Sequence, residues 1–331
     1  MIFRKKLKLL INYLIFKKIF KINEIRIILP LILLIIFFGL LKPAFLSVKN
    51  LQSIVGAASF HGIIVLGMTY SFIVRRPDLS IGSTAGLSAI IAGISMAWFG
   101  LPIWLGITIA LLVSMIIGLI NGILTVKLQI PPIVATLGML FILRGFAYVL
   151  CGGIIVYPLP DITIEFVKLK LLGFPISFII FLILAIIFDF ILRKTTFGRK
   201  VYATGADVRV ARLMGINTNL IRIMMHIQLG IFSAIGGILY MFNMGNASPN
   251  IGVGWEFPVI VGVVIGGVSL LGGIGTVLGA FFGILIVQTL YNGLTIIGLK
   301  GIYENIAIGF VILIIVIIDA WKRTRMVKKK L

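Results

Sequence analysis

Acidic residues, cysteine and histidine are all scarce in this sequence. Asp and Glu together number 9 among 331 residues, and none falls clearly at the middle of an apolar run, where an ion-coupled carrier would need one. The lone Cys151 excludes an internal disulfide and a multi-cysteine metal site. His61 and His226 lie far apart in the sequence, without the short ligand spacing of a typical zinc site. We therefore expect no metal centre.

Nucleotide-binding and hydrolase motifs are absent as well. The sequence contains no Gly-x-x-x-x-Gly-Lys-Ser/Thr loop and no Gly-Lys pair, so the chain should neither bind nor hydrolyse ATP by itself. Gly-x-Ser-x-Gly and His-Glu-x-x-His are also missing. The sequence thus predicts a protein that is not an enzyme and has no cofactor in its own chain.

Apolar side chains are what the sequence has in quantity. They make up 60% of the residues, with a mean hydropathy of +1.22, which is too apolar for a soluble protein. A helix that crosses a bilayer needs about 20 mostly apolar residues. We expect an all-α integral membrane protein with about ten transmembrane helices. The predicted spans are residues 27–41, 52–74, 80–98, 103–124, 132–150, 174–192, 218–240, 257–271, 275–297 and 304–320.

Basic residues are concentrated at the two ends of the chain. Lys and Arg number 30 and give a net charge of +21, with basic segments at 1–26 and 321–331. Because such segments stay in the cytoplasm, both termini should be cytoplasmic, flanking a single transmembrane domain at 27–320. The tails should also contact anionic lipid headgroups. Nucleic-acid binding is the alternative explanation of the charge, and this placement disfavours it.

A weak internal repeat is visible in the sequence. Leu119-Ile120-Asn121-Gly122, followed by Gly138, matches Leu290-Tyr291-Asn292-Gly293, followed by Gly309, at the same spacing. The two segments cross the membrane in opposite directions in the predicted topology, which indicates an inverted repeat, although two Asn-Gly pairs can also coincide by chance. The glycines clustered near 266–275 favour an interrupted helix; close helix packing is the alternative.

Asp78 is the most suggestive ionisable residue. Pro77 ends one predicted helix, and Asp78 or Ser80 can cap the next. A purely structural carboxylate, paired with Arg75 or Arg76, is the alternative to a role in transport. Arg144 falls near the middle of its span and should face the bundle interior, either bound to backbone carbonyls or lining a path.

The cytoplasmic loop at 193–217 is the longest on its side of the predicted topology. It contains six basic residues and glycines suited to turns. A cytoplasmic partner could therefore dock there.

Taken in order, seven short motifs resemble those of permease subunits of ribose/xylose/galactose-type ABC importers. Each motif is weak alone, but their order and spacing hold from about residue 30 to 320. The motifs are residues 72–83, 121–122, 135–138, 144–145, 196–199, 211–216 and 266–279.

The resemblance implies a type II importer-like permease of the bacterial cytoplasmic membrane. It also implies three partners: a second permease chain, identical or different, an extracytoplasmic sugar-binding protein, and a separate ATPase that holds ATP and Mg²⁺. The loop at 193–217 resembles the family's ATPase-coupling segment. Its candidate residues are Thr196, Phe197, Gly198, Arg199, Gly205, Ala211, Arg212 and Gly215.

Three departures from the family pattern stand out. Arg75-Arg76-Pro77 occupies the place of the usual Gly-Gly-Ile, Gly205-Ala206-Asp207 that of Gly-Gly-Asn, and Arg209-Val210-Ala211 that of Glu-Ala-Ala. The first adds two charges and a rigid φ next to the expected path. Arg209 replaces an acidic residue expected to meet the partner, so the ATPase should be co-adapted.

A monosaccharide is uncharged, so its path should offer hydroxyl, amide and aromatic contacts. Nucleosides, branched-chain amino acids and sugar-like signals remain alternative solutes. An ion-coupled secondary transporter, a membrane enzyme and a structural membrane protein are the other classes considered. The candidate path residues, chosen by motif position, are Asp78, Ser80, Ser83, Asn121, Thr136, Arg144 and Asn292.

Overall fold

The computed structural model describes residues 23–299 and, beyond Lys300, residues 301, 303, 306, 309, 310 and 313. The basic segments predicted at 1–26 and 321–331 and the span predicted at 304–320 lie wholly or mostly outside these residues. The helices that open the chain are α2 (Asn23–Leu41), η1 (Pro43–Leu46), α3 (Val48–Ile73), α4 (Ile81–Ala97), α5 (Ile103–Gly122), η2 (Ile123–Lys127) and α6 (Pro132–Leu150). They are followed by α7 (Asp161–Lys168), β1 (Lys170–Leu171), β2 (Phe174–Pro175), α8 (Ile176–Lys194), α9 (Thr196–Ala206), α10 (Val208–Leu213), α11 (Thr218–Met244), α12 (Glu256–Ile265) and α13 (Val277–Ile296).

Long apolar helices dominate the structure. Within the described residues, 6 helices are long and apolar enough to cross a membrane, and three shorter apolar ones are Ile27–Leu41, Ile81–Ala97 and Glu256–Ile265. Each span predicted within this part of the chain coincides with one of these helices, although 257–271 is helical only over Glu256–Ile265. The chain is therefore an all-α, multi-pass membrane protein.

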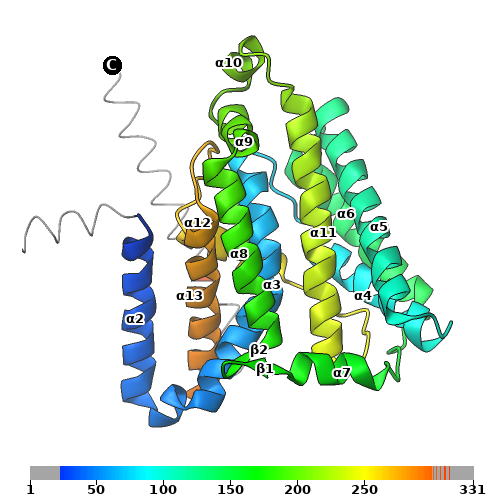
Figure 1. The fold of residues 1–331 in the computed structure, drawn as a ribbon, viewed down its shortest axis with the longest axis vertical. Helices are drawn as coiled ribbons and strands as arrows, with labels where there is room; N and C mark the ends of the chain where they lie inside the picture. The colour runs from blue at the N-terminus through cyan, green and yellow to red at the C-terminus, as the bar shows by residue number, and fades with distance from the viewer. Residues whose placement is uncertain are drawn as a thin grey trace, which may run out of the picture.

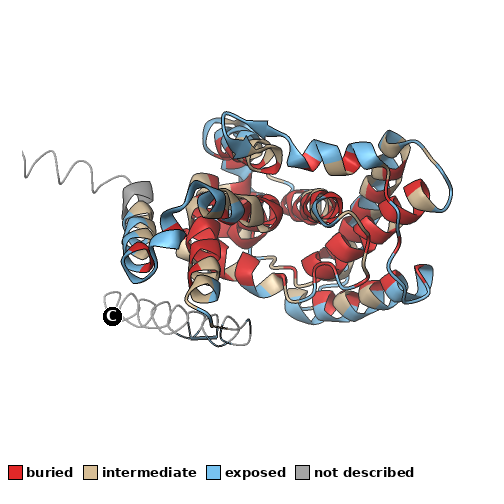
Figure 2. Ribbon diagram, turned by 90° about the horizontal axis from the view of Figure 1, so that it is seen from below, coloured by how far each residue is buried: buried red, intermediate tan, exposed pale blue. Residues whose placement is uncertain are grey.

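Three of the long helices form the centre of the bundle, together with the shorter α4, in which 15 of 17 residues are buried. The apolar windows of α3, α11 and α13 are each 61% buried, whereas those of α5, α6 and α8 are 22–28% buried. Figure 2 shows the buried residues gathered in the middle and the exposed ones around the outside. The outer helices expose apolar side chains because lipid, not water, surrounds them.

The two ends of the bundle differ. α9 and α10 lie at one end, the top of Figure 1, and we call it the α10 end; α7 and the β1–β2 hairpin lie at the other, the α7 end. The hairpin pairs Lys170 with Pro175 and Leu171 with Phe174. The loop predicted at 151–173 therefore contains a short helix and a strand.

The halves of the chain are arranged as the inverted repeat predicts. α3 and α11 have 26 and 27 residues, and α5 and α13 have 20 each. α3 runs toward the α10 end and α11 away from it (Figure 1). α4 and α12 each follow an interrupted segment, at 74–80 and 245–255.

The interrupted segments meet inside the bundle. A side chain on Gly82 would overlap the carbonyl of Gly252, and one on Gly252 would overlap that of Gly82. Two α-carbons can therefore approach closely only because both residues are glycine. The interruption predicted near 266–275 is confirmed: α12 ends at Ile265, and four glycines with positive φ precede α13.

Candidate coupling segment, polar cluster and pocket

Two short helices make up the predicted coupling segment. Thr195 caps α9 by accepting a hydrogen bond from the Gly198 amide at 3.2 Å. Asp207 caps α10 by accepting from the amides of Arg209 at 2.7 Å and Val210 at 3.2 Å. These N–H donors hold the pKa of the exposed Asp207 below its ordinary value, because they stabilise the carboxylate. Asp207 can therefore act as the helix N-cap as well as the Asn expected from the family resemblance, because Asp and Asn are equally good N-cap residues.

α9 packs tightly into the α10 end of the bundle. A side chain on Gly198 would overlap the carbonyl of Leu192, and one on Gly205 would overlap that of Ile73. The Tyr202 hydroxyl donates to the carbonyl of Gly275 at 2.6 Å. α9 is thus bound both to the end of α3 and to the segment before α13.

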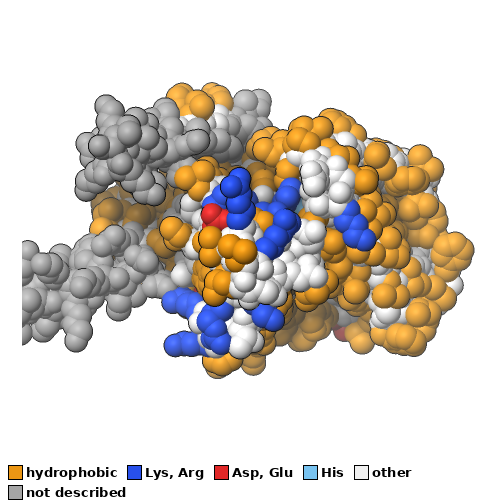
Figure 3. Space-filling model, turned by 90° about the horizontal axis from the view of Figure 1, so that it is seen from above, with side chains coloured by type: hydrophobic (Ala, Val, Ile, Leu, Met, Phe, Trp, Pro, Cys, Tyr) orange, Lys and Arg blue, Asp and Glu red, His pale blue; other side chains and the backbone are white. Residues whose placement is uncertain are grey.

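α10, in contrast, projects beyond the bundle (Figure 1). Two of its apolar side chains are exposed, by 52% at Val210 and 88% at Leu213, as is Met214 at 72%, whereas Ala211 is buried. Gly215, at φ +77°, ends the helix, and the Ile216 amide closes the turn on the carbonyl of Ala211. Figure 3 looks down on this end, where basic side chains form several groups and acidic ones a single spot. Exposed apolar side chains at Val210, Leu213 and Met214, surrounded by basic residues, are suited to binding another protein.

The predicted coupling residues are distributed over this unit. α9 holds Thr196, Phe197, Gly198, Arg199 and Gly205, α10 holds Ala211 and Arg212, and Gly215 follows α10.

A buried polar cluster surrounds Asp78, which is 3% exposed. One carboxylate oxygen accepts from the Ser80 amide at 2.8 Å and from the Ser80 hydroxyl at 2.6 Å. The other accepts from the Asn121 amide nitrogen at 2.9 Å and lies 3.2 Å from Nδ1 of His226. Asp78 therefore pairs with His226, and neither Arg75 nor Arg76 reaches it.

The same cluster ties four parts of the bundle together. His226, fully buried on α11, contacts the Thr125 hydroxyl through Nε2 at 3.1 Å. The Thr136 hydroxyl on α6 accepts from the Leu79 amide at 3.0 Å. Of the predicted path residues, Asp78, Ser80, Asn121 and Thr136 are thus brought together. From the sequence, His226 was considered as a zinc ligand; the available signal for its role here was an ionisable group inside a predicted span.

The other predicted path residues lie elsewhere. Ser83 is buried, and its hydroxyl has no partner in the described part of the chain. Arg144 donates to the carbonyls of Pro249 at 2.5 Å and Ile251 at 2.7 Å, and so holds the 245–255 segment in place. Asn292 pairs with Asn50 through two hydrogen bonds of 2.9 Å. The seven candidates therefore do not form one continuous lining.

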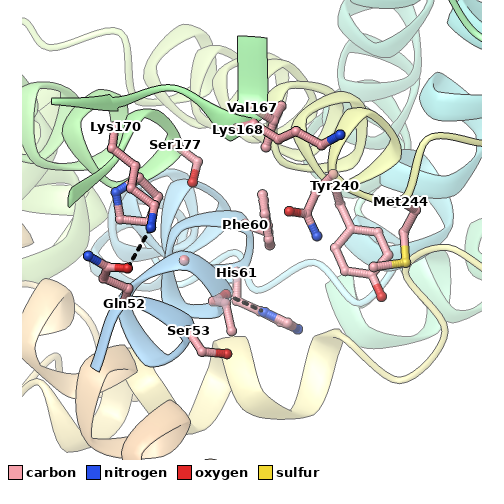
Figure 4. A pocket seen from close by; sticks show the side chains of 14 residues that line it. Gln52, Ser53, Phe60, His61, Val167, Lys168, Lys170, Ser177, Tyr240 and Met244 are labelled. Atoms are coloured by element: carbon pink, nitrogen blue, oxygen red, sulfur yellow. Dashed lines mark hydrogen bonds between the residues drawn. The ribbon is translucent and has the colours of Figure 1, made fainter. Parts of the chain in front are cut away.

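A cavity of about 570 Å³ opens at the α7 end, between α3, α7, α8 and α11. The Phe60 ring lies edge-on to the Tyr240 ring, with 5.4 Å between the ring centroids. The Trp255 ring contacts both Tyr240, at a centroid distance of 5.1 Å, and His61, at 4.5 Å. Figure 4 shows side chains from several helices converging on this space. The polar or charged lining residues are Gln52, Ser53, His61, Lys168, Lys170, Ser177, Tyr240 and Asn243, and none of the lining residues is acidic.

The cavity was not predicted, and none of the candidate path residues lines it. Lys170 closes one side by donating to Gln52 at 2.7 Å. Nothing in the sequence indicates that these residues lie together, because they come from four helices and the β1–β2 hairpin. Among the residues that the structure describes, no three His, Cys, Asp or Glu side chains gather as a metal site would require.

Comparison with known proteins connects the chain to transport. Residues 50–316 match the family described as branched-chain amino acid transport system / permease component. The chain is 34% identical over 306 residues to the ribose import permease protein of Haemophilus influenzae, covering 91% of this chain and 94% of that one. It is 36% identical over 308 residues to the autoinducer 2 import system permease protein of Photorhabdus luminescens, covering 90% and 91%.

No solved structure matches the chain. The resemblance to sugar-importer permeases that the motifs indicated is confirmed by these relatives. The chain therefore belongs to the family of branched-chain amino acid transport system permease components, among relatives that import ribose and autoinducer 2.

Proposed function

We propose that this chain is the permease subunit of an ATP-driven importer for a small polyhydroxylated solute, a monosaccharide or a sugar-like signal. An extracytoplasmic binding protein delivers the solute, and a separate ATPase chain holds ATP and Mg²⁺. A second permease chain, identical or different, completes the transporter. The observation that carries the proposal is the projecting, apolar α10, anchored through α9 to two bundle segments.

The charge distribution supports the orientation. The loop 193–217 at the α10 end is basic, as are the segments 1–26 and 321–331, and basic segments mark the cytoplasmic side. The α10 end thus faces the cytoplasm of a bacterium and the α7 end faces outward. On this assignment the 570 Å³ cavity opens toward the binding protein.

The lining of the cavity suits a sugar. Aromatic faces at Phe60 and Tyr240 can stack on the apolar face of a sugar ring, and the amides of Gln52 and Asn243 can bond its hydroxyls. A branched-chain amino acid would need a partner for its ammonium group, and no lining residue is acidic. The cavity therefore favours a neutral polyol over an amino acid.

Transport would then proceed through the contacts of α9. When ATP closes the ATPase pair, α10 moves with it, and α9 transmits the displacement to Ile73 and Gly275. These residues end α3 and precede α13, two of the three long central helices. Shifting them alternates access between the two ends of the bundle.

The test is purification of the chain from its native membrane, followed by reconstitution with the co-purifying chains. ATPase activity is measured with ribose, autoinducer 2, leucine and adenosine in turn. The proposal predicts stimulation by a sugar-like solute only, reduced by Tyr240→Ala. Leu213→Asp should abolish co-purification of the ATPase, whereas Leu172→Asp, 89% exposed at the α7 end, should not.

Transport by the isolated chain, driven by protons, is the result that would contradict the proposal. Because Asp78 and His226 form a buried ionisable pair, proton-coupled transport by the isolated chain is the competing outcome. A lone chain that moves solute along a proton gradient, with no ATPase bound, would refute the importer assignment.

A further inference from the structure

Four arginines gather at the α10 end, next to the Asp78 cluster. Arg222 lies near enough to Arg76, Arg212 and Arg75 to be repelled by all three. Two of the four, Arg75 and Arg76, are adjacent in the segment that links α3 to α4. Like charges gathered at the edge of a membrane need an anion or water to compensate them.

The contacts of the neighbouring residues place Arg222 between two of the other arginines. Thr218, Arg222 and His226 follow one another at intervals of four along α11, so they share a face. Arg212 donates to the Thr218 hydroxyl at 3.0 Å. One turn on the other side of Arg222, His226 contacts Thr125.

Arg76 completes this arrangement. From the 74–80 segment it donates to the carbonyl of Thr125 on η2 at 3.0 Å, the residue whose hydroxyl His226 contacts. Arg212 is exposed, Arg76 half-buried and Arg222 only 9% exposed. The three guanidinium groups therefore gather along one face of α11, and they differ in how far they are buried.

Arg222, the most buried of the three arginines, has an unpaired hydrogen-bond donor within the described residues. The Nε atoms of Arg222 and Arg76 are buried without a hydrogen-bond partner. Within the described ranges, the carboxylates in ion pairs are Asp78, with His226, and Asp189, with Arg193. Asp207 is the acid near Arg75, but it is exposed and caps α10. A buried guanidinium with an open donor is costly unless an acceptor fills the site.

Arg75 adjoins these arginines in a strained conformation. Its φ of +60° lies in the left-handed region, which favours glycine. Its side chain donates to the Ala206 carbonyl at 2.7 Å and packs against Gly272. Strain of this kind persists where the side chain is used.

We propose that Arg76, Arg212 and Arg222 form a binding site for a phosphate group at the α10 end. Guanidinium groups match phosphate oxygens in geometry, and three of them suit a group with more than one charge. The phosphate can come from solution or from a lipid headgroup that enters beside α11. The site is independent of the solute carried through the bundle.

The experiment uses the full chain in dodecyl maltoside, a detergent without phosphate. The unfolding midpoint is measured in inorganic phosphate and in chloride at equal ionic strength. A parallel titration compares phosphatidylglycerol with diacylglycerol, which lacks the phosphate. We expect a saturable rise of several degrees with at least one phosphate source, because a ligand that binds the folded state stabilises it. A rise with inorganic phosphate alone indicates a soluble phosphate, a rise with phosphatidylglycerol alone indicates a lipid headgroup, and a rise with both indicates recognition of the phosphate group itself.

Variants separate this site from general charge effects. Arg222→Gln should abolish the rise, Arg222→Lys should keep part of it, and Lys127→Gln, an exposed basic residue nearby, should keep all of it. Arg76→Gln serves if Arg222→Gln does not fold. The proposal is overturned if neither source stabilises the chain or if Arg222→Gln keeps the full rise. It is also overturned if stabilisation requires the ATPase chain, because a carboxylate of that partner would then be the group that pairs with these arginines.

Discussion

Gly205→Ala is the sharpest test of the link between α9 and the bundle. Gly205 is buried in the last turn of α9, and an added Cβ would overlap the Ile73 carbonyl and lie 2.8 Å from the Gly273 amide. Both obstacles are backbone atoms, which cannot rotate away, so the cost belongs at the upper end of the about 1–3 kcal/mol typical of overpacking. Alanine returns up to about 1 kcal/mol of helix propensity. A net loss of about 2 kcal/mol remains.

The assay has two parts, with a matched control. Unfolding of the purified chain measures stability, and solute-stimulated ATPase of the reconstituted transporter measures coupling; both should fall. Gly138→Ala makes the same chemical change in α6, where a Cβ meets no atom within 4 Å, so it should preserve coupling and leave stability equal or higher. If Gly205→Ala behaves like Gly138→Ala in both assays, α9 does not transmit motion through this contact.

Three further substitutions test other contacts. Tyr202→Phe removes the donor to Gly275 and should cost about 1 kcal/mol and part of the coupling; unchanged stimulation of ATPase would contradict this. Asp78→Asn breaks a buried pair with His226 and should destabilise the chain by about 3–5 kcal/mol, and a variant with the wild-type unfolding midpoint would show the charge to be dispensable. Gly215→Pro should deform the turn after α10 and uncouple transport while membrane insertion persists; normal sugar-stimulated ATPase in the complex would argue the reverse.

Hydropathy was sufficient to place the helices, because each span buries its own backbone hydrogen bonds and needs only length and apolar character. The glycines at 266–275 also predicted the interruption of a helix, and four of them have positive φ in the structure. The 245–255 segment falls between two predicted spans, and no local signal indicated that it returns into the bundle. Its return to Gly82 depends on contacts across the bundle, which periodicity does not encode.

Long-range pairing limited the prediction of the polar cluster. Asp78, Ser80, Asn121 and Thr136 were chosen by motif, yet the partner of the carboxylate is His226, 148 residues away. Arg75 or Arg76 was the partner in the structural alternative, but Arg75, with its positive φ, donates to Ala206 on α9 and Arg76 to Thr125. Local sequence proximity is thus a poor guide to ion pairing where the backbone turns.

The separation of Asp78 from His226 has a consequence for biosynthesis. Multi-pass proteins are made from the N-terminus onward, so Asp78 reaches the lipid well before its histidine is translated. Ser80, then Asn121 some 43 residues on, are the partners available in that interval. A chain halted before α11 therefore keeps an incompletely neutralised carboxylate in the bilayer.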